Sequence, residues 1–553
     1  MKKMIKYLVL PVAVISLWSC HKLDVAPNSE LTSSVFPTTD AQYKALIGPI
    51  YTALRGTWSG SYWFTQSCTS DEAVLPAFGS NWYDGNKYQE LHRHTWTKDN
   101  AWVTSTWNDM TNIVGIANQT LYLLKDAPEG ATKNAGVAEL RTMRAFAYFL
   151  LMDMYGNVPL DTVYGATAPN ANATRAQVFN YCETELKASI PNLKAVSGAT
   201  VYGKPNRYTA YSILAKMYLN AEVYTGTARN NDCIAACDSV INSGLYAIEP
   251  RSSYLQMFYP TNGPGMKEFI FAVPYDPATS NGYMFHARYD LNRNLGMKYK
   301  YSGATVGSNV NPVVNLTTGN GLNNVQPSGP RMTLPEYYAN FNDANDIRNQ
   351  QWLTGPQTWA DGSPIMVKTT KKGYDQNYAG ADGSTVITYP LVIDPNVSLR
   401  INNPLFDVGN DEIGWNFGTR NIKFLADYTN TVNRNQNNDV PVFRYSDIIL
   451  MKAEAILRGG TATSGSTALS LVNSIRSNRS TSAAWTAVTL ADIYAERCRE
   501  FAWESWHRND MIRFGKFEGT YGFKTDANTY KRIFPIPASA LSSNLKLVQN
   551  TGY

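Results

Sequence analysis

The chain has 553 residues and a formal net charge of +5, and charged residues make up only 17% of it. It contains no block of lysines and arginines of the kind that follows a phosphate backbone, so we do not expect a nucleic-acid partner. Aromatic residues reach 12%, with 35 tyrosines and 13 tryptophans, which fits a surface for neutral polar ligands such as sugars and equally fits a large core with tyrosine-rich loops.

The N-terminus has the pattern of a bacterial export signal. A lysine-rich start precedes an apolar run at residues 7–17, which is too short to cross a bilayer, since a spanning helix needs roughly 20 residues. Cys20 follows a small residue, and this predicts cleavage before Cys20 and its lipidation; the alternative is an ordinary secretory signal that contains a cysteine. We predict a signal peptide at residues 1–19 and a polar tether at residues 20–39.

Helical periodicity runs through the first half of the chain beyond the tether. Apolar residues recur at spacings of three and four, the pattern of a helix with one buried face. The segments with this pattern or a similar one are 40–54, 107–121, 137–155, 175–190, 207–224 and 230–243. Aromatic residues that alternate with alanine across these helices are similar to tetratricopeptide packing, although no 34-residue period is sustained. Residues 57–100 are rich in Gly, Ser and aromatic residues, which predicts loops.

The texture changes from residue 250 to residue 440, where Gly, Asn, Pro and Thr are frequent and short β-like runs such as 269–273 occur. Helical patterns resume over the segments 445–457, 468–479 and 490–514. We therefore expect a mainly α fold of irregular tetratricopeptide-like helix pairs in one unit, residues 40–553. Its helical scaffold is expected at 40–249 and 441–553, and its loop-rich, ligand-facing region, with small strands, at 250–440.

Several motifs, in this order along the chain, resemble hallmarks of the SusD/RagB family. They are Arg144-Ala-Phe-Ala-Tyr148, Tyr155-Gly-Asn-Val-Pro-Leu160, Arg444-Tyr-Ser-Asp447, Lys452-Ala-Glu-Ala455, Val472-Asn-Ser-Ile-Arg476, the charged stretch 496–515 and the ending 535–553. Two positions depart from the family pattern: Ser505 stands where Gly is usual, and His507 where Arg is common.

This resemblance implies a surface-exposed lipoprotein of the outer membrane with four tetratricopeptide-like helix pairs. Members of the family cover a SusC-like, TonB-dependent transporter, capture oligosaccharides and pass them on; some bind peptides, and they are not enzymes. The resemblance therefore implies a SusC-like transporter and an oligosaccharide or polysaccharide as partners, and the residues predict no cofactor.

The charged stretch near the C-terminus has carboxylates that a glycosidase would need. Glu496, Glu500 and Glu504 are four residues apart, so on a single helix they would share one face. Arginines accompany them, and a carboxylate paired with an arginine, such as Glu504 with Arg508, has its pKa lowered rather than raised. We therefore predict a structural ion network; its expected members are Glu496, Arg497, Glu500, Glu504, Arg508, Asp510 and Arg513.

Cysteine and histidine do not indicate a metal site. Of six cysteines, five remain once Cys20 is lipidated, an odd and sparse set that predicts buried thiols rather than disulfides. Cys233 and Cys237 have no histidine or second cysteine pair nearby that would complete a zinc site. His92 and His94 are expected to pack in a loop. Calcium is conceivable in the Asp- and Asn-rich middle, but no loop has the arrangement of an EF-hand.

Two aromatic clusters are the best candidates for ligand binding. Sugars present apolar C–H faces that stack on Trp or Tyr and hydroxyl rims that bond to amides and carboxylates, so a site needs both kinds of group. The first cluster is Asn81, Trp82, Tyr83, Asp84 and Asn86; the second is Tyr283, Arg288, Tyr289 and Asn292. The alternative is that these rings only pin loops to the helical body.

The sequence thus predicts a non-catalytic surface lipoprotein that captures a glycan. Three other hypotheses stay open. The first is a peptide-capturing lid on the same type of transporter, and the second is a surface glycosidase with its acids at 496–504. The third is a structural plug whose aromatic residues contact only the barrel.

Overall fold

The computed structural model describes residues 36–79, 81–276, 289–292, 295, 314–315, 329–359, 361–369, 387–399, 406–409, 412–425 and 436–553. The predicted signal peptide, Cys20 and most of the tether lie outside these residues. The described part is mainly helical with short strand pairs, which confirms the predicted fold class.

The helices of the N-terminal half are α2 (Asp40–Gly56), α3 (Trp63–Ser67), α4 (Gln89–Arg93), α5 (Ala101–Leu124), α6 (Ala131–Tyr155), α7 (Arg175–Ser189), α8 (Arg207–Leu219), α9 (Ala221–Thr225) and α10 (Asn230–Ile241). Those that follow are α12 (Pro335–Tyr338), α13 (Glu412–Trp415), α14 (Tyr445–Leu457), α15 (Ala468–Arg476), α16 (Leu490–Phe501), α17 (His507–Arg513) and α18 (Ala538–Ser543). Among the described residues, none of the helices is long and apolar enough to cross a membrane.

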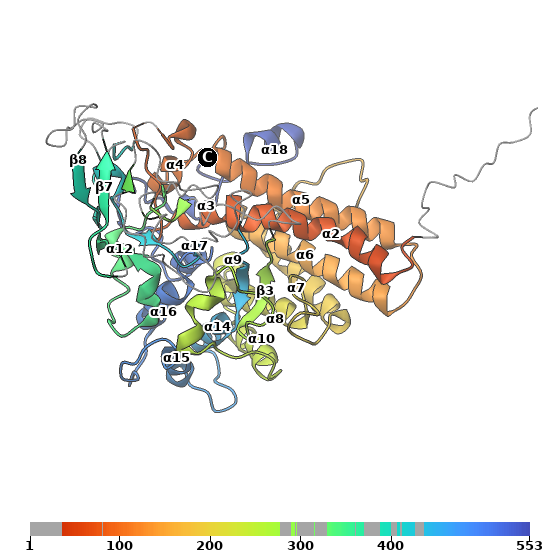
Figure 1. Ribbon diagram of the computed structural model, residues 1–553. Helices are drawn as coiled ribbons and strands as arrows, with labels where there is room; N and C mark the ends of the chain where they lie inside the picture. Colours follow the sequence, from red (N-terminus) through yellow and green to blue (C-terminus); the bar gives the residue numbers. More distant parts are fainter. Residues whose placement is uncertain are drawn as a thin grey trace, which may run out of the picture.

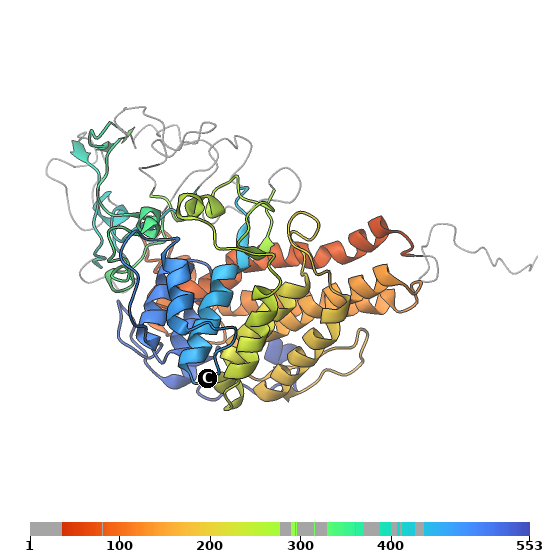
Figure 2. The ribbon, with the colours of Figure 1, turned by 90° about the horizontal axis from the view of Figure 1, so that it is seen from below.

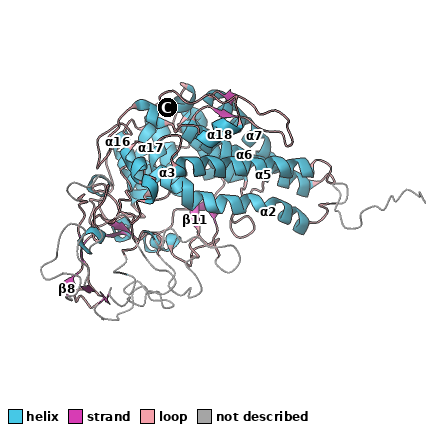
Figure 3. Cartoon of the chain, turned by 90° about the horizontal axis from the view of Figure 1, so that it is seen from above, coloured by secondary structure: helices cyan, strands magenta, loops and turns pink. Residues whose placement is uncertain are grey.

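The helices form one stack in which each packs against the next. α5 packs on α6, α6 on α7, α7 on α8 and α8 on α10. The chain then leaves the stack for the loop-rich region and returns with α14, which packs on α10, α15 and α16 (Figure 2). The expectation that the final helices pack back on the early ones is confirmed. Figure 3 shows most helices gathered on one side of the molecule, with β8 on the other.

Short strands pair at the two ends of the loop-rich region and within it. β3 (Phe269–Val273), the strand predicted from its apolar run, pairs antiparallel with β11 (Val440–Arg444), which leads directly into α14. This pair joins the two ends of the region. The other sheets are β1 (Val158–Pro159) with β2 (Asn172–Ala173), β5 (Trp352–Leu353) with β10 (Arg420–Asn421), β6 (Gly355–Pro356) with β9 (Val392–Ile393), and β4 (Val314–Asn315), β7 (Met366–Thr369) and β8 (Ile387–Pro390) in one three-stranded sheet (Figure 1).

Local sequence explains where several of these helices begin and end. Five of the described helices begin with a capping box. In this motif the side chain of the residue before the helix accepts a hydrogen bond from the backbone N–H of the third helical residue. The side chain of that third residue in turn accepts one from the backbone N–H of the capping residue. The capping residues are Thr39 for α2, Thr174 for α7, Asn206 for α8, Thr467 for α15 and Thr489 for α16. α6 ends at Gly156, as predicted, with a φ of +72° that favours glycine.

The prediction of loops throughout residues 57–100 is wrong for residues 57–67 and for α4, which includes His92. α2 continues through a π-helical segment, Thr57–Tyr62, into α3, with non-helical backbone angles at Gly60. Trp58 and Tyr62 in this segment are fully buried, and their rings stack at a centroid distance of 4.9 Å. Burial of the large aromatic side chains outweighs the low helix propensity of the glycines, because each such ring buries about 150–250 Å².

The single helix expected over residues 490–514 is two helices, α16 and α17. Between them Trp503 and Ser505 have φ values of +63° and +68°, which no α-helix accommodates. The buried Trp503 ring packs on Trp63 at 5.1 Å and its indole N–H donates to Thr333 Oγ1 at 3.1 Å. The left-handed backbone at Ser505 is the reason why glycine suits this position.

Candidate functional site

The first predicted cluster lies in a strained turn between α3 and α4. Trp82, Asp84 and Asn86 have φ values of +63°, +45° and +70°, all in the left-handed region that side chains other than glycine rarely adopt. The turn is held from behind, since Gln89 Nε2 donates to the carbonyl of Trp82 at 3.0 Å and to that of Leu75 at 3.2 Å. Such strain persists only where the surroundings hold it, and it concentrates at functional sites.

Trp82 stands on a support that comes from the second predicted cluster. Its half-buried ring meets Tyr289 edge to face, with centroids 4.8 Å apart. The Arg331 guanidinium lies 5.1 Å from the Tyr289 ring and 3.6 Å from the Trp63 ring, and it pairs with Asp290 at 3.4 Å. The structure therefore brings residues of both clusters together, with the Trp82 ring resting on a packed cation–aromatic stack.

The predicted ligand-binding residues differ in solvent exposure: those of the first cluster are at least partly exposed, and the described ones of the second cluster are buried. Asn81 and Asp84 are exposed, and Trp82, Tyr83 and Asn86 are half-buried. In contrast, Tyr289 and Asn292 are buried, and Asn292 Nδ2 donates to Trp415 O and Asn416 Oδ1 at 2.9 Å each. A ligand can reach the first group, whereas the buried Tyr289 supports the Trp82 ring and Asn292 bonds to residues next to α13. Tyr283 and Arg288 lie outside the described residues.

Sequence reasoning missed Trp102, which lies at the other end of the same aromatic cluster. Its ring stacks on Phe64 at 4.3 Å, and Phe64 in turn contacts Tyr289 at 6.3 Å. Trp102 is half-buried, and Lys87 Nζ lies 5.4 Å from its ring. It lies in the first turn of α5, between the predicted loops at 57–100 and the helical pattern predicted from residue 107, so neither prediction included it. Trp82 and Trp102 are thus two partly exposed indoles on one aromatic cluster.

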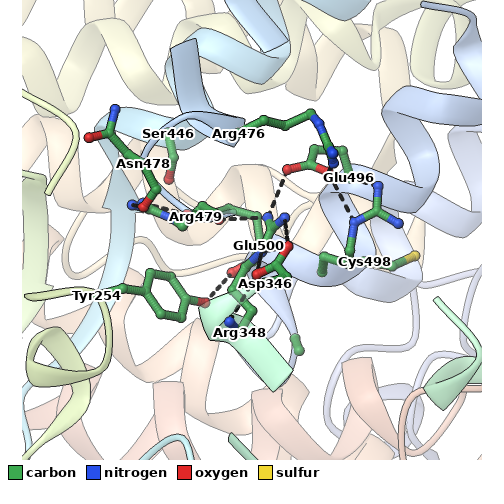
Figure 4. A network of polar contacts seen from close by, with 12 residues as sticks. Tyr254, Asp346, Arg348, Ser446, Arg476, Asn478, Arg479, Glu496, Cys498 and Glu500 are labelled. Atoms are coloured by element: carbon green, nitrogen blue, oxygen red, sulfur yellow. Dashed lines mark hydrogen bonds and ion pairs between the residues drawn. The ribbon is translucent and has the colours of Figure 1, made fainter. Parts of the chain in front are cut away.

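The charged stretch forms a buried network around Glu500 (Figure 4). Glu500 accepts hydrogen bonds from Arg348 at 3.0 Å, Arg444 at 2.9 Å and Arg479 at 2.9 Å. Glu496 accepts from Arg348 at 2.8 Å and from Arg499 at 2.7 Å. The side chains of Glu496 and Glu500 have no exposed surface.

A second group of ion pairs joins α16 and α17 to α14. Arg497 pairs with Asp447 at 2.9 Å and with Asp510 at 2.8 Å, and Arg513 pairs with Asp510 at 2.6 Å and with Glu454 at 2.7 Å. All five side chains are almost fully buried. These ion pairs link α16 and α17 with each other and with α14, which lies about 50 residues earlier in the chain. They therefore fix how the last helices pack.

Two details of the predicted network are wrong. Glu504 does not pair with Arg508: it accepts from Arg444 at 2.8 Å and from Lys423 at 2.5 Å, while Arg508 donates to the carbonyls of Lys531 and Arg532 at 3.1 and 2.7 Å. α16 ends at Phe501, so Glu504 lies outside it and does not share a helix face with Glu496 and Glu500. The break at residues 502–506 is the cause of both differences.

The electrostatics of these carboxyl groups do not suit a glycosidase. Burial alone would raise the pKa of Glu496, but Arg348 and Arg499 reverse this and lower its pKa to about 2. For Glu500, Arg479, Arg444 and Arg348 likewise overcome the effect of burial and hold the pKa well below its usual value. A glycosidase needs an acid with a raised pKa that touches the sugar, and neither group offers this.

No cluster of three or more His, Cys, Asp or Glu side chains that could hold a metal ion occurs in the part of the chain that the structure describes. Cys68, Cys182, Cys233, Cys237 and Cys498 are free and buried, which confirms the prediction of buried thiols. His92 and His94 are buried at the end of α4.

Comparison with known proteins matches the chain over most of its length. A model of the SusD family matches residues 267–553, and a model described as starch-binding, associating with outer membrane, matches residues 22–219. The starch-binding protein SusD of Bacteroides thetaiotaomicron is 22% identical over 536 residues, which cover 90% of this chain and 86% of that protein.

Solved structures of similar fold include two proteins that are named for, or bound to, a glycan. A laminarin-binding SusD-like protein has a TM-score of 0.63 and 20% identity, and covers 93% of this chain and 99% of its own. Surface glycan-binding protein A from Bacteroides thetaiotaomicron, in complex with laminarihexaose, has a TM-score of 0.65 and 17% identity, and covers 93% of this chain and 100% of its own. At this identity the likeness shows the fold.

Proposed function

Because the chain belongs to the SusD family, we propose that it is a non-catalytic protein of the outer membrane that binds an oligosaccharide or polysaccharide. It passes this ligand to a SusC-like TonB-dependent transporter. The similar proteins named for starch and laminarin support a glycan as the ligand class. The buried, arginine-paired carboxylates of the C-terminal stretch support a function without catalysis.

The observation that carries the proposal is the half-exposed Trp82 ring, fixed edge to face on Tyr289 and surrounded by polar side chains. The Trp82 ring offers a rigid apolar face on which a sugar can stack. The side chains of Asn81, Asp84 and Asn86 can form hydrogen bonds with the hydroxyl groups of that sugar. A shallow site with little desolvation binds weakly, on the order of micromolar to millimolar. A polysaccharide that presents many equivalent segments rebinds and so raises the effective affinity.

Affinity electrophoresis of the soluble chain, residues 21–553, through gels cast with plant, fungal and host polysaccharides tests this function. We expect at least one polysaccharide to retard the protein. The double change Trp82→Ala/Tyr83→Ala is expected to lower the affinity for it by about tenfold or more, because one stacking ring contributes roughly 1–3 kcal/mol to binding of a planar or flat-faced ligand.

The matched control is Tyr122→Ala/Tyr164→Ala, which removes two exposed tyrosines whose rings lie 5.4 Å apart at the end of α5 and outside the site. This variant should migrate like the parent protein. Retardation that survives loss of Trp82 and Tyr83 would move the site elsewhere, and no retardation across the panel would contradict glycan binding.

The anchor is proposed to be lipid on Cys20, which would attach the protein to the outer membrane. Replacing Cys20 by alanine is expected to move the protein from the membrane fraction to the soluble fraction, since no other anchor is predicted and two acyl chains are needed for stable attachment. Fractionation after metabolic labelling with a fatty acid checks this. Fatty-acid labelling of Cys20→Ala at the parent level would contradict the anchor.

The peptide-capturing lid and the structural plug predict results that differ from each other and from those expected for glycan binding. A peptide lid predicts heat on titration with peptides and no retardation by glycans. A plug predicts that Trp82→Ala alters the complex with the transporter while no ligand binding is found. The glycosidase hypothesis requires release of reducing ends over time, which the buried Glu496 and Glu500 do not support.

A further inference from the structure

A groove of about 1200 Å³ lies along α2 and is lined by residues of α2, α5 and α6. α2 and α6 are in contact beside it: Thr132 Oγ1 donates to Asp40 Oδ1 at 3.2 Å, and a Cβ on Gly136 would lie 2.9 Å from Ile47 Cδ1. The groove extends along this contact and reaches the segment between α7 and α8. In Figure 1 the N-terminal end of α2 lies at the opposite end of the helical body from α4, so the groove is distinct from the Trp82 site.

Positive charge predominates on the groove wall. Four of the lining side chains are cationic, Lys44, Arg55, Lys194 and Lys204, and two carry carboxyl groups, Asp40 and Glu139. Lys44 and Lys194 are exposed and Lys204 is half-buried. Within the described ranges, none of these three lysines forms an ion pair. The groove therefore has unneutralised positive charge.

The wall also carries a fixed polar pair. The Tyr51 hydroxyl donates to Glu139 Oε2 at 2.8 Å, and both side chains are half-buried. Burial raises the pKa of Glu139, although the Tyr51 hydrogen bond and the charges of Lys204 and Lys194 oppose this. The two lysines thus lie close enough to Glu139 to act on its charge. Removing that carboxylate would leave the groove more positive.

The rest of the lining mixes apolar and uncharged polar groups. Ile47, Pro49 and Ile116 supply apolar surface, and the Asn112 and Asn192 amides supply donors and acceptors. The volume lies at or above the upper end of small-molecule sites, which are about 300–1000 Å³. A ligand that suits this wall is elongated and has apolar C–H faces, hydroxyl groups and negative charge.

From this arrangement we propose that the groove is a second ligand site, which binds an anionic oligosaccharide through Lys44, Lys194 and Lys204. The negative groups of the ligand are carboxylates, as in a uronic acid, or sulfate esters. This site goes beyond the proposed function, which requires only the Trp82 surface, and its test does not depend on that surface.

Titration calorimetry of the mature chain tests the site with four hexasaccharide or peptide probes. They are a galacturonic-acid hexamer, a sulfated hexasaccharide, a neutral hexasaccharide and a hexaglutamate peptide. We expect the uronate or the sulfated probe to bind and the neutral probe to bind at least tenfold more weakly. Affinity should fall as salt is raised from about 0.05 to 0.5 M, because the Debye length shortens severalfold.

Charge variants locate the binding. Lys194→Glu/Lys204→Glu is expected to lower the affinity about tenfold or more, since each reversal turns an attraction into a repulsion. Glu139→Gln should raise it severalfold, because it removes a negative charge and keeps an acceptor for Tyr51. The exposed Lys516, outside the groove, provides the matched control Lys516→Glu, with unchanged affinity expected.

Trp82→Ala/Tyr83→Ala is expected to bind the anionic probe as the parent does, which separates this site from the proposed glycan surface. Three results would overturn the inference: no binding of either anionic saccharide, binding that Lys194→Glu/Lys204→Glu leaves unchanged, or preferential binding of the glutamate peptide. The unfolding curve of Lys194→Glu/Lys204→Glu should match that of the parent, because neither lysine is buried in the core.

Discussion

Replacing Glu500 by glutamine is expected to lower the free energy of unfolding by about 3–5 kcal/mol. Glu500 is fully buried and accepts hydrogen bonds from Arg348, Arg444 and Arg479. Glutamine has nearly the same shape but no charge, so three buried guanidinium groups lose a shared counter-ion. Breaking a buried ion pair from one side is strongly destabilising, because the remaining charge stays away from water.

Urea denaturation, read as the midpoint and slope of the transition, measures the effect. Glu129→Gln is the matched control, since it makes the same chemical change where Glu129 pairs with Lys133 at 2.6 Å but keeps 81% of its side chain exposed. That pair should contribute less than about 1 kcal/mol. A Glu500→Gln protein that unfolds at the parent midpoint would contradict the structural role of the network.

The same network connects the loop-rich region to the helical scaffold. Arg348 lies in the segment between α12 and β5, and Arg444 ends β11, which pairs with β3; both converge on Glu500 of α16. Glu268, just before β3, pairs with both Arg444 and Arg479. The loop-rich insertion is therefore fastened to α16 by ion pairs as well as by the β3–β11 pair.

The family, the fold class and most helices could be predicted because their signals are local. Each of these signals lies within a single short segment of the sequence. Examples are the capping residues Thr174 and Thr489 and the apolar spacing in α14. The predicted bounds of α14 agree with the structure at both ends, and the strand at 269–273 also agrees. Such elements need no knowledge of what they pack against.

Features that depend on distant partners could not be predicted. Glu504 pairs with Lys423 and Arg444, far away in sequence, rather than with Arg508 four residues on. The contact of Trp82 with Tyr289 joins two clusters that the sequence presents separately. The groove beside α2 is lined by residues of three helices and of the segment between α7 and α8, and no single helix carries a sign of it. In each case the tertiary packing decides which groups meet.

His92 is expected to make the protein less stable as the pH falls from about 6.5 to 4. Its ring is fully buried at the end of α4, where Phe523 N–H donates to Nε2 at 3.4 Å. Burial lowers the pKa of the His92 imidazole to about 4; the charge of Asp71 opposes this shift, and those of Arg93 and Lys524 add to it. Between these two pH values the unfolded chain binds a proton at His92 and the folded chain does not, so acid favours unfolding.

The size of the effect follows from the difference in pKa between the two states. An unfolded value of 6.5 and a folded value of about 4 correspond to roughly 3 kcal/mol, fully present above pH 6.5 and lost by pH 4. His92→Gln keeps an acceptor for Phe523 and removes the titrating ring. The carboxyl groups are common to both proteins, so subtracting their unfolding free energies isolates His92. That difference should change by about 3 kcal/mol between pH 7 and pH 4, in the direction of relative destabilisation of the parent in acid; a constant difference would mean that the ring is protonated in the folded protein as readily as in the unfolded chain.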